Sequence, residues 1–447
     1  MPTPTGRLPP GSMGLPLAGE TLAFLKNPFA FLEERRARHG KVFKSSLVGR
    51  RIIFVSGIEG AEAFYDPENI SREDAHPFPL VDLFGGINME MYDGPRHQAL
   101  KAMALASFDR AAIAGYLPDL QALIERTLAA LAAREEFQAT KELRKLVIEA
   151  ICQTTMGMQS GPETDAICAD YGLILKGLVS VPVPFPGTPY AKARAARDRV
   201  LAHIRRVIAA RRATPGNDAV SRMLAAKAAD GRVYTDDEAA LEVHHIVIAG
   251  FIVYGLMAEL TRRLAEAPAL LARCRDEIAD GAPSGPLTVE ALAKLRTCFS
   301  VVLETKRYVP LVPLAFGRAK RTFTCAGHEV PEGWTCYLAL TVNNKDPDIF
   351  REPQKFDPDR FGPGRAEHER HAMAFIPQGA APQGGAGKMN HRCLGLDYST
   401  FLTLSYLTLL VRGYTFELPA QDLTYRWTTI PPEPKDGMRV RLRARQP

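Results

Sequence analysis

One cysteine stands where a flexible loop meets an apolar helix. The stretch FIPQGAAPQGGAGKMNHRCLGLDYSTFLTL, residues 375–404, runs through a glycine-rich loop into His391-Arg-Cys393-Leu-Gly395. A cysteine just before a helix faces unpaired backbone N–H groups and the positive end of the helix dipole, and both favour the thiolate. Because a thiolate binds metals or attacks electrophiles, Cys393 is the first candidate for chemistry.

Three roles for Cys393 remain open on this stretch alone. A nucleophile needs a nearby histidine base, but His391 is two residues away and would point elsewhere in an extended segment. A single axial ligand to haem iron needs room for a flat macrocycle, which Gly395 and the loop provide, and donors for the propionates, such as His391 and Arg392. The third role is that of a small buried hydrophobic residue, the common fate of a free cysteine.

A second group of chemical interest is a charged set. Glu304 and Arg307, in SVVLETKRYVP, are three residues apart and share one helix face. Apolar residues precede them, so we expect a buried pair, which is costly unless further hydrogen bonds satisfy it. We therefore expect a third partner, and Arg360 in KFDPDRF is the candidate. The alternative is an ordinary surface pair.

Helical periodicity dominates the elements that must position these residues. The pattern predicts a mainly α fold with a small β-rich lobe, and no composition break divides residues 1–447 into more than one domain. Helices are expected over 28–39, 97–107, 113–133, 140–157, 190–213, 235–266, 268–280, 288–308 and 394–411, and strands within 41–56, 320–341 and 413–445.

Composition limits the class of protein. At 46% hydrophobic and 24% charged, with a net charge of +6, the chain is typical of globular proteins. The basic segment 191–213 predicts an amphipathic helix with a solvated face; it has no interleaved aromatics, which argues against nucleic-acid binding. A docking surface for an acidic redox partner is a weaker alternative.

The cysteines and the apolar runs indicate the compartment. Seven scattered cysteines without a CxxC argue against a disulfide framework, and we expect all but Cys393 to be small buried residues. We see neither a signal peptide nor 18 unbroken apolar residues, so we expect a cytoplasmic protein without a membrane span.

Taken together, the motifs resemble the cytochrome P450 superfamily in content, order and spacing. They are Glu304-x-x-Arg307, Phe356-Asp-Pro-Asp-Arg360-Phe361 and His391-Arg-Cys393-Leu-Gly395, and the resemblance runs from Leu8-Pro9-Pro10-Gly11 onward. It implies the cytochrome P450 fold, heme b (iron protoporphyrin IX) as cofactor, and Cys393 as the thiolate ligand, which favours O–O cleavage.

The resemblance also implies residues around the cofactor. His97, in YDGPRHQALK, looks like the family's helix residue that contacts a propionate, with Lys101 one turn on. Arg318 is a further propionate candidate, from its place after Arg307. His391 and Gly395 complete the expected cofactor-binding set, and the Glu-Arg-Arg set would fix the loop that carries the cysteine.

The lead-in to the cysteine departs from the common pattern. The usual aromatic seven residues before it is replaced by Ala386, and Phe375 lies eighteen residues back. Such a lead-in resembles the fatty-acid peroxygenase branch, which takes hydrogen peroxide directly and needs no reductase. The segments 83–97, 307–314 and 414–437 are similar to that branch as well.

The helix expected to cross the distal face of the haem lacks two residue pairs that related proteins carry there. Monooxygenases carry an acid–alcohol pair there that relays protons for the use of dioxygen. If Ala249-Gly250 is the family's small pair, those positions hold Ile252 and Val253, and neither donates a proton. The Arg-Pro pair of the peroxygenase branch falls on Ile248-Ala249, so the anchor for a fatty-acid carboxylate is missing and burying that carboxylate would be unfavourable.

Glu90 is the candidate for the missing proton carrier. In the peroxygenase branch a Gln or His precedes the Asp-Gly, and here NMEMYDG has Glu90 at that position. Among apolar side chains its pKa should be raised by desolvation, which suits a proton shuttle in peroxide activation. The alternative is a solvent-facing glutamate. His244 and His245 are other acid–base candidates, and at most one should face the haem.

Three functions follow from the resemblance. The first is a haem-thiolate peroxygenase or peroxidase that uses hydrogen peroxide on a hydrophobic small molecule. The second is a monooxygenase fed by a ferredoxin and reductase pair. The third is a non-redox haem-thiolate protein, for example a rearrangement enzyme that acts on a pre-formed peroxide bond.

Overall fold

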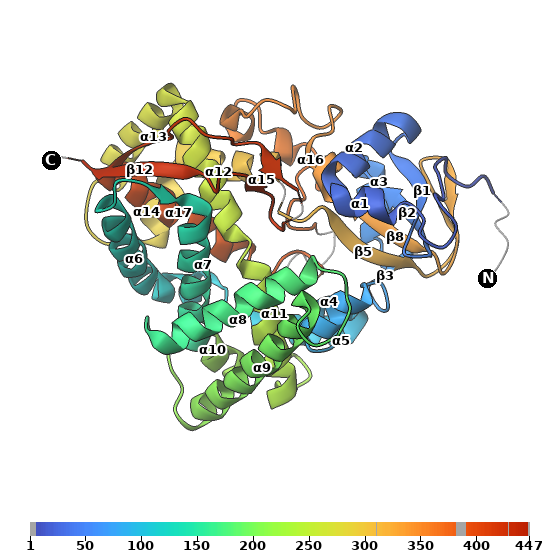
Figure 1. Ribbon diagram of the computed structural model, residues 1–447, viewed down its shortest axis with the longest axis horizontal. Helices are drawn as coiled ribbons and strands as arrows, with labels where there is room; N and C mark the ends of the chain where they lie inside the picture. Colours follow the sequence, from blue (N-terminus) through green and yellow to red (C-terminus); the bar gives the residue numbers. More distant parts are fainter. Residues whose placement is uncertain (1–5, 310, 381–389, 428, 446–447) are drawn as a thin grey trace.

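The chain folds into a large helical body and a smaller lobe that contains most of the strands (Figure 1). The computed structural model describes residues 6–309, 311–380, 390–427 and 429–445. The glycine-rich lead-in, residues 381–389, lies outside the described residues. The expected class, mainly α with a small β-rich lobe, is confirmed.

The helices of the first half of the chain include those that surround the candidate site. They are α1 (Thr21–Lys26), α2 (Pro28–His39), α3 (Gly57–Tyr65), α4 (Phe78–Leu83), the 3-10 turn η1 (Met89–Met91), α5 (Gly94–Leu105), α6 (Arg110–Ala132), α7 (Ala139–Met156), α8 (Pro162–Leu178), α9 (Pro189–Ala213) and α10 (Ala219–Ala225).

The helices of the second half include the central helix and the helix that follows Cys393. They are α11 (Asp236–Gly250), α12 (Val253–Glu266), α13 (Pro268–Gly281), α14 (Val289–Lys294), α15 (Arg296–Tyr308), α16 (Leu340–Asn344), η2 (Pro358–Phe361), η3 (Glu367–Glu369) and α17 (Leu396–Gly413).

The main sheet has the strand order β1-β2-β8-β5-β3 and is packed beside α1, α2 and α3 (Figure 1). β2 pairs parallel with β8, and the other neighbours pair antiparallel. A three-stranded sheet, β4-β12-β9, ties the carboxyl terminus to the helical body. The strands are β1 (Val42–Leu47), β2 (Arg50–Val55), β3 (Ile70–Ser71), β4 (Phe137–Gln138), β5 (Leu314–Ala319), β6 (Phe323–Cys325), β7 (His328–Val330), β8 (Thr335–Ala339), β9 (Tyr414–Glu417), β10 (Tyr425–Arg426), β11 (Glu433–Pro434) and β12 (Arg439–Ala444).

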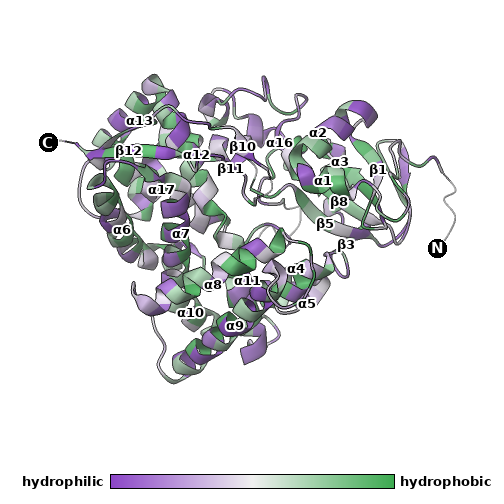
Figure 2. Cartoon of the chain, viewed as in Figure 1, coloured by the Kyte–Doolittle hydropathy of each residue, from purple (hydrophilic) through white to green (hydrophobic). Residues whose placement is uncertain are grey.

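The basic segment forms the amphipathic helix that its pattern predicts, α9 (Figure 2). Its apolar residues are buried, while basic residues on its other face pair with acidic side chains of neighbouring segments. For example, Arg199 pairs with Asp170 of α8, and Arg212 lies 2.6 Å from Asp236 at the start of α11. The positive charge of this face is therefore partly balanced within the chain.

The expected helix over 235–266 is broken once, near its middle. α11 begins with a capping box between Thr235 and Glu238, and the break between α11 and α12 lies at Phe251 and Ile252. There the backbone changes to tighter bonds: Tyr254 N–H donates to Phe251 O at 3.3 Å. The combined stretch Asp236–Glu266 is long and apolar enough to cross a membrane, but 67% of its apolar window is buried within the protein, as in a core helix.

Candidate functional site

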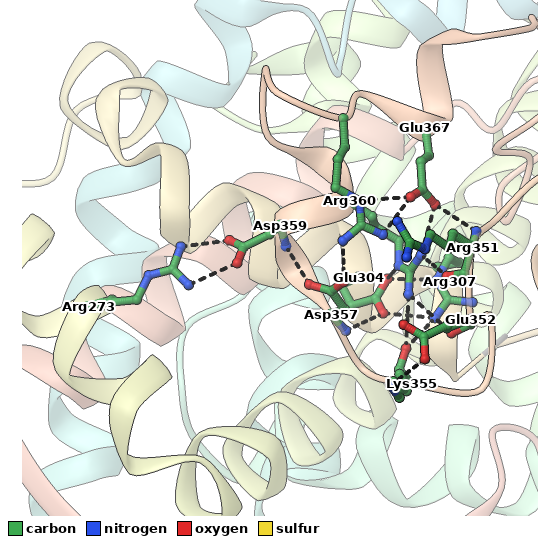
Figure 3. Close-up of polar contacts among 11 residues, drawn as sticks. Arg273, Glu304, Arg307, Arg351, Glu352, Lys355, Asp357, Asp359, Arg360 and Glu367 are labelled. Atoms are coloured by element: carbon green, nitrogen blue, oxygen red, sulfur yellow. Dashed lines mark hydrogen bonds and ion pairs between the residues drawn. The ribbon is translucent and has the colours of Figure 1, made fainter.

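A buried glutamate and two buried arginines join α15 to the segment that follows α16 (Figure 3). The side chains of Glu304, Arg307 and Arg360 have no exposed surface. Arg307 donates to both carboxylate oxygens of Glu304, at 2.7 and 2.8 Å, and Arg360 Nε lies 3.2 Å from Glu304 Oε2. The expected third partner is confirmed, and the surface-pair alternative is wrong.

The other N–H groups of these arginines bind one segment, residues 344–367. Their acceptors are Asn344 O (2.9 Å), Arg351 O (2.8 Å), Pro353 O (2.8 Å), Lys355 O (3.0 Å) and Glu367 Oε2 (2.8 Å). A buried ion pair is stable when such bonds satisfy its remaining donors. The network therefore fixes a long irregular segment to α15.

Gln378 contacts both the backbone and the sulfur of Cys393. Its N–H donates to Gln378 O at 2.9 Å, and Gln378 Nε2 lies 3.7 Å from its Sγ. α17 begins three residues later, at Leu396. Gly379 has a φ of +80°, and a Cβ there would lie 2.7 Å from His391 O, so the two segments approach closely only because this residue is glycine.

The thiol of Cys393 is subject to opposing effects. The residue keeps exposed surface, and burial raises the pKa of its thiol above the usual value. The Gly395 N–H and the ammonium groups of Lys306 and Lys101 act in the opposite direction and favour the thiolate.

His97 and Lys101, one turn apart on α5, lie beside the cysteine loop. Lys101 Nζ donates to Arg392 O at 2.6 Å, and burial lowers the pKa of Lys101 to about 8. His97 is 3% exposed, and its ring centroid lies 4.1 Å from that of His391. The structure thus brings together three of the expected propionate-binding residues.

Glu90 is the acidic partner of His391. The turn η1 holds Glu90 so that its Oε2 lies 3.6 Å from His391 Nδ1, while Asp93 Oδ1 lies 3.2 Å from His391 Nε2. The sequence led us to expect a raised pKa for Glu90, and that expectation is wrong: burial acts in that direction but does not prevail. His391, and then Arg72 and His76, outweigh burial and hold that pKa below its usual range.

Arg72, which the sequence analysis missed, is a buried cation near Glu90, whereas Arg318 is not. Arg72 is 4% exposed, donates to Phe316 O, and acts on the pKa of Glu90. Arg318 is exposed and lines a surface hollow with Arg50 and Arg51, so the structure does not bring it to the site. Arg72 belongs to no sequence motif, and its place near the site follows only from the pairing of β3 with β5.

The central helix turns one face toward the same region. His245, Ala249 and Ile252 recur at helical spacing and keep accessible surface, whereas Val253 is only 3% exposed. His244 faces the core, where its Nε2 lies 3.0 Å from Leu83 O. Of the two adjacent histidines, His245 is therefore the one on the accessible face.

A further histidine, His76, borders the same region. Burial lowers the pKa of His76 to about 4; Glu90 and His245 both act on it, which places the three groups near one another. Its Nδ1 is buried and has no hydrogen-bond partner among the described residues. The sequence analysis missed His76, since nothing in its neighbours marks it.

The residues around Cys393 fit a haem. A thiolate is the donor that haem iron takes from a single cysteine, and Lys101, His391 and Arg72 supply positive or donor groups for carboxylates. His97 Nε2 is buried without a hydrogen-bond partner among the described residues, while Nδ1 lies 2.8 Å from Met89 O. A propionate at Nε2 would complete that ring's hydrogen bonds.

Replacing His97 by Phe should weaken haem binding. Burial, then His391, lowers the pKa of His97 to about 4, and a propionate beside the ring would raise it again. A hydrogen bond to a charged group contributes about 1.5–3 kcal/mol, so haem affinity should fall roughly 10- to 100-fold. Haem titration of the His97→Phe apoprotein measures this. His203→Phe, which replaces a buried histidine of α9, should keep the parent affinity; equal affinities for both variants would contradict the role.

Comparison with known proteins places this site in a family. The family model for cytochrome P450 matches residues 9–429. The chain belongs to the cytochrome P450 family. Among curated proteins, a putative cytochrome P450 120 of Synechocystis is 27% identical over 439 residues, 97% of this chain and 96% of its own. Abscisic acid 8'-hydroxylase 2 of Oryza sativa is 25% identical over 98% of this chain and 86% of its own.

Solved cytochrome P450 structures share the whole fold. Cyanobacterial CYP120A1 with retinoic acid bound has a TM-score of 0.90 and 26% identity, covering 99% of this chain and 100% of its own. A single-residue variant of cytochrome P450 OleT in complex with arachidonic acid has a TM-score of 0.83 at 21% identity, covering 99% and 100%. Haem b is the cofactor of this family, so the expected cofactor is confirmed at the level of the family.

Proposed function

We propose that Cys393 holds haem b through its thiolate and that this cytochrome P450 uses hydrogen peroxide to oxidise a hydrophobic small molecule. The observation that carries the proposal is an aliphatic side chain on the central helix together with a carboxylate beside the cysteine loop. The accessible face of the central helix offers aliphatic Ile252 where a proton relay would be needed, while the carboxylate of Glu90 lies at the site beside His391. Peroxide brings its own protons, so it needs only one carrier.

The chain's residues have separate tasks in this proposal. Bound haem supplies the oxidation chemistry. His97, Lys101, His391 and Arg72 bind and orient its carboxylates. Glu90 accepts a proton from one oxygen of peroxide and returns it to the other, which leaves as water; its lowered pKa keeps it ionised and ready to accept, but makes it a weaker base than it would be with the raised pKa expected from the sequence. Ile252 excludes water at the accessible face of the central helix, whereas Val253, which the sequence also suggested for this task, is buried away from that face.

The substrate proposed is apolar. Phe84 lies beside His245, with ring centroids 5.5 Å apart, and α4 adds the partly buried Leu80 and Val81. The apolar side chains on this part of the site suit a hydrophobic ligand. Two structurally similar proteins have retinoic acid and arachidonic acid bound, and both ligands have long apolar bodies.

A second candidate is a monooxygenase that takes electrons from a ferredoxin and reductase. It is favoured by a relative named as a hydroxylase, abscisic acid 8'-hydroxylase 2. In that case ordered water or the substrate would supply the protons that Ile252 and Val253 cannot.

One experiment separates the two candidates. The haem-loaded protein is given a panel of lipids and aromatic compounds, either with hydrogen peroxide or with NAD(P)H, ferredoxin and reductase. The proposal predicts product with peroxide alone. Product formed only in the presence of the reductase system would replace it by the second candidate, and Cys393→Ser serves as the control for uncatalysed oxidation.

A further inference from the structure

A lysine ammonium is buried behind Cys393, on the last turn of α15. Lys306 is 1% exposed. Its Nζ donates to Gln378 Oε1 at 2.6 Å, Thr400 Oγ1 at 2.7 Å and Ser399 Oγ at 3.1 Å. The three donors of the ammonium are thus satisfied by neutral oxygens.

Lys306 has no carboxylate partner within ion-pair distance in the described part of the chain. Burial lowers the pKa of its ammonium to about 7, and the Cys393 thiolate is the strongest of the groups that act against this. An uncompensated buried charge is strongly unfavourable. Cys393 and, more weakly, Asp397 are the anions that act on Lys306, and the contacts of Gln378 provide the link to the sulfur.

Gln378 connects the two charged groups. Its Nε2 lies 3.7 Å from Cys393 Sγ and 3.1 Å from Ser399 Oγ, while its Oε1 accepts from Lys306. A lysine can only donate, so it fixes which end of the amide faces which neighbour. Gln378 must turn its oxygen to Lys306 and its N–H group to the sulfur.

We propose that Lys306 is a positioning residue that, through Gln378, limits the electron donation of the Cys393 sulfur to the haem iron. A cation and an N–H donor beside the sulfur stabilise negative charge on it. Reduction of the iron by one electron makes the iron–sulfur unit more negative, so Lys306 raises the reduction potential. The inference rests on the proposed ligation by Cys393.

The reduction potential of the haem-loaded protein, titrated with a chemical reductant, tests this. In Lys306→Met the equilibrium constant for reduction should fall at least tenfold, which lowers the potential by about 59 mV for one electron. Lys306→Arg, which keeps the charge, should stay within about twofold of the parent. Gln378→Leu should lower the potential in the same direction. Lys355→Met, which removes an exposed charge, should leave it unchanged.

The possible results separate the role of Lys306 from the ligation by Cys393 on which it rests. A parent protein without a thiolate spectrum would refute the ligation itself. A normal thiolate spectrum with equal reduction potentials in the parent and Lys306→Met would overturn the role of Lys306 alone. An equal drop in reduction potential in Lys306→Met and Lys306→Arg would do the same, since it indicates a merely structural effect. If Lys306→Met takes up no haem, Gln378→Leu decides: an unchanged potential there overturns the inference.

Discussion

Glu304→Gln is expected to destabilise the protein by about 3–5 kcal/mol, the typical cost of breaking a buried ion pair. The substitution keeps the shape of the side chain but removes the only charge that touches both Arg307 and Arg360 among the described residues. Two guanidinium groups then stay buried, and only Arg360 keeps a carboxylate, Glu367. Because domains are stable by only about 5–15 kcal/mol, much of the protein should be recovered unfolded or without haem.

Urea unfolding followed by circular dichroism measures the change in the free energy of unfolding. Glu290→Gln is the matched control, since Glu290 pairs with Arg110 at 3.0 Å on the surface and both side chains are exposed. The control should unfold like the parent. If Glu304→Gln also unfolds like the parent, the network does not have the structural role assigned to it.

Glu90→Gln is expected to lower peroxide-driven turnover by about 10²-fold or more at equal haem loading, because general acid–base groups contribute about that factor. Glutamine keeps the size and hydrogen-bonding ability of Glu90 but cannot take up a proton. The measurement is the initial rate with hydrogen peroxide, normalised to haem. Glu73→Gln, an exposed glutamate of the neighbouring segment, is the control.

The pH dependence adds a second test of Glu90. His391 and Arg72 hold the pKa of Glu90 below its usual range, so the carboxylate stays ionised as pH falls. Peroxide-driven turnover should therefore stay level from pH 6 down to pH 4, whereas a glutamate with the ordinary pKa of about 4.3 would be mostly protonated at pH 4. Full turnover in Glu90→Gln would remove Glu90 from the reaction; His76, whose Nδ1 has no hydrogen-bond partner among the described residues, and the accessible His245 would then be the next acid–base candidates.

The sequence predicts those elements whose periodicity is strong. The expected helix 28–39 has the bounds of α2, and 190–213 differs from α9 by one residue. α8 was missed, because its apolar positions are interrupted by polar residues and glycine. The break between α11 and α12 leaves the apolar pattern intact, so no periodicity could reveal it.

The site was predictable where its residues carry motifs and not where packing alone assembles it. Cys393, His97 and the Glu-Arg-Arg set are recognisable from order and spacing. Arg72, His76 and the link from Lys306 to Gln378 depend on segments that are distant in the chain. The wrong prediction for Arg318 has a different cause. A side chain at Gly317 would face Phe64 and Ile70, and side chains alternate along a strand, so the next residue, Arg318, points to the opposite face of the sheet.

The cysteine prediction was correct for most of the other cysteines. Five of the remaining six are buried and one, Cys168, is intermediate. Burial raises the pKa of Cys325 to about 12, so it stays a thiol at neutral pH. Cys393 differs from them because it keeps exposed surface and has cations nearby.

The carbon-monoxide difference spectrum of the reduced, haem-loaded protein tests the central claim most directly, when parent and Cys393→Ser are compared. If the sulfur of Cys393 binds the iron, the parent shows the red-shifted Soret band of thiolate ligation and the serine variant loses it. The same thiolate band in both proteins, or none in a fully loaded parent, would contradict the account.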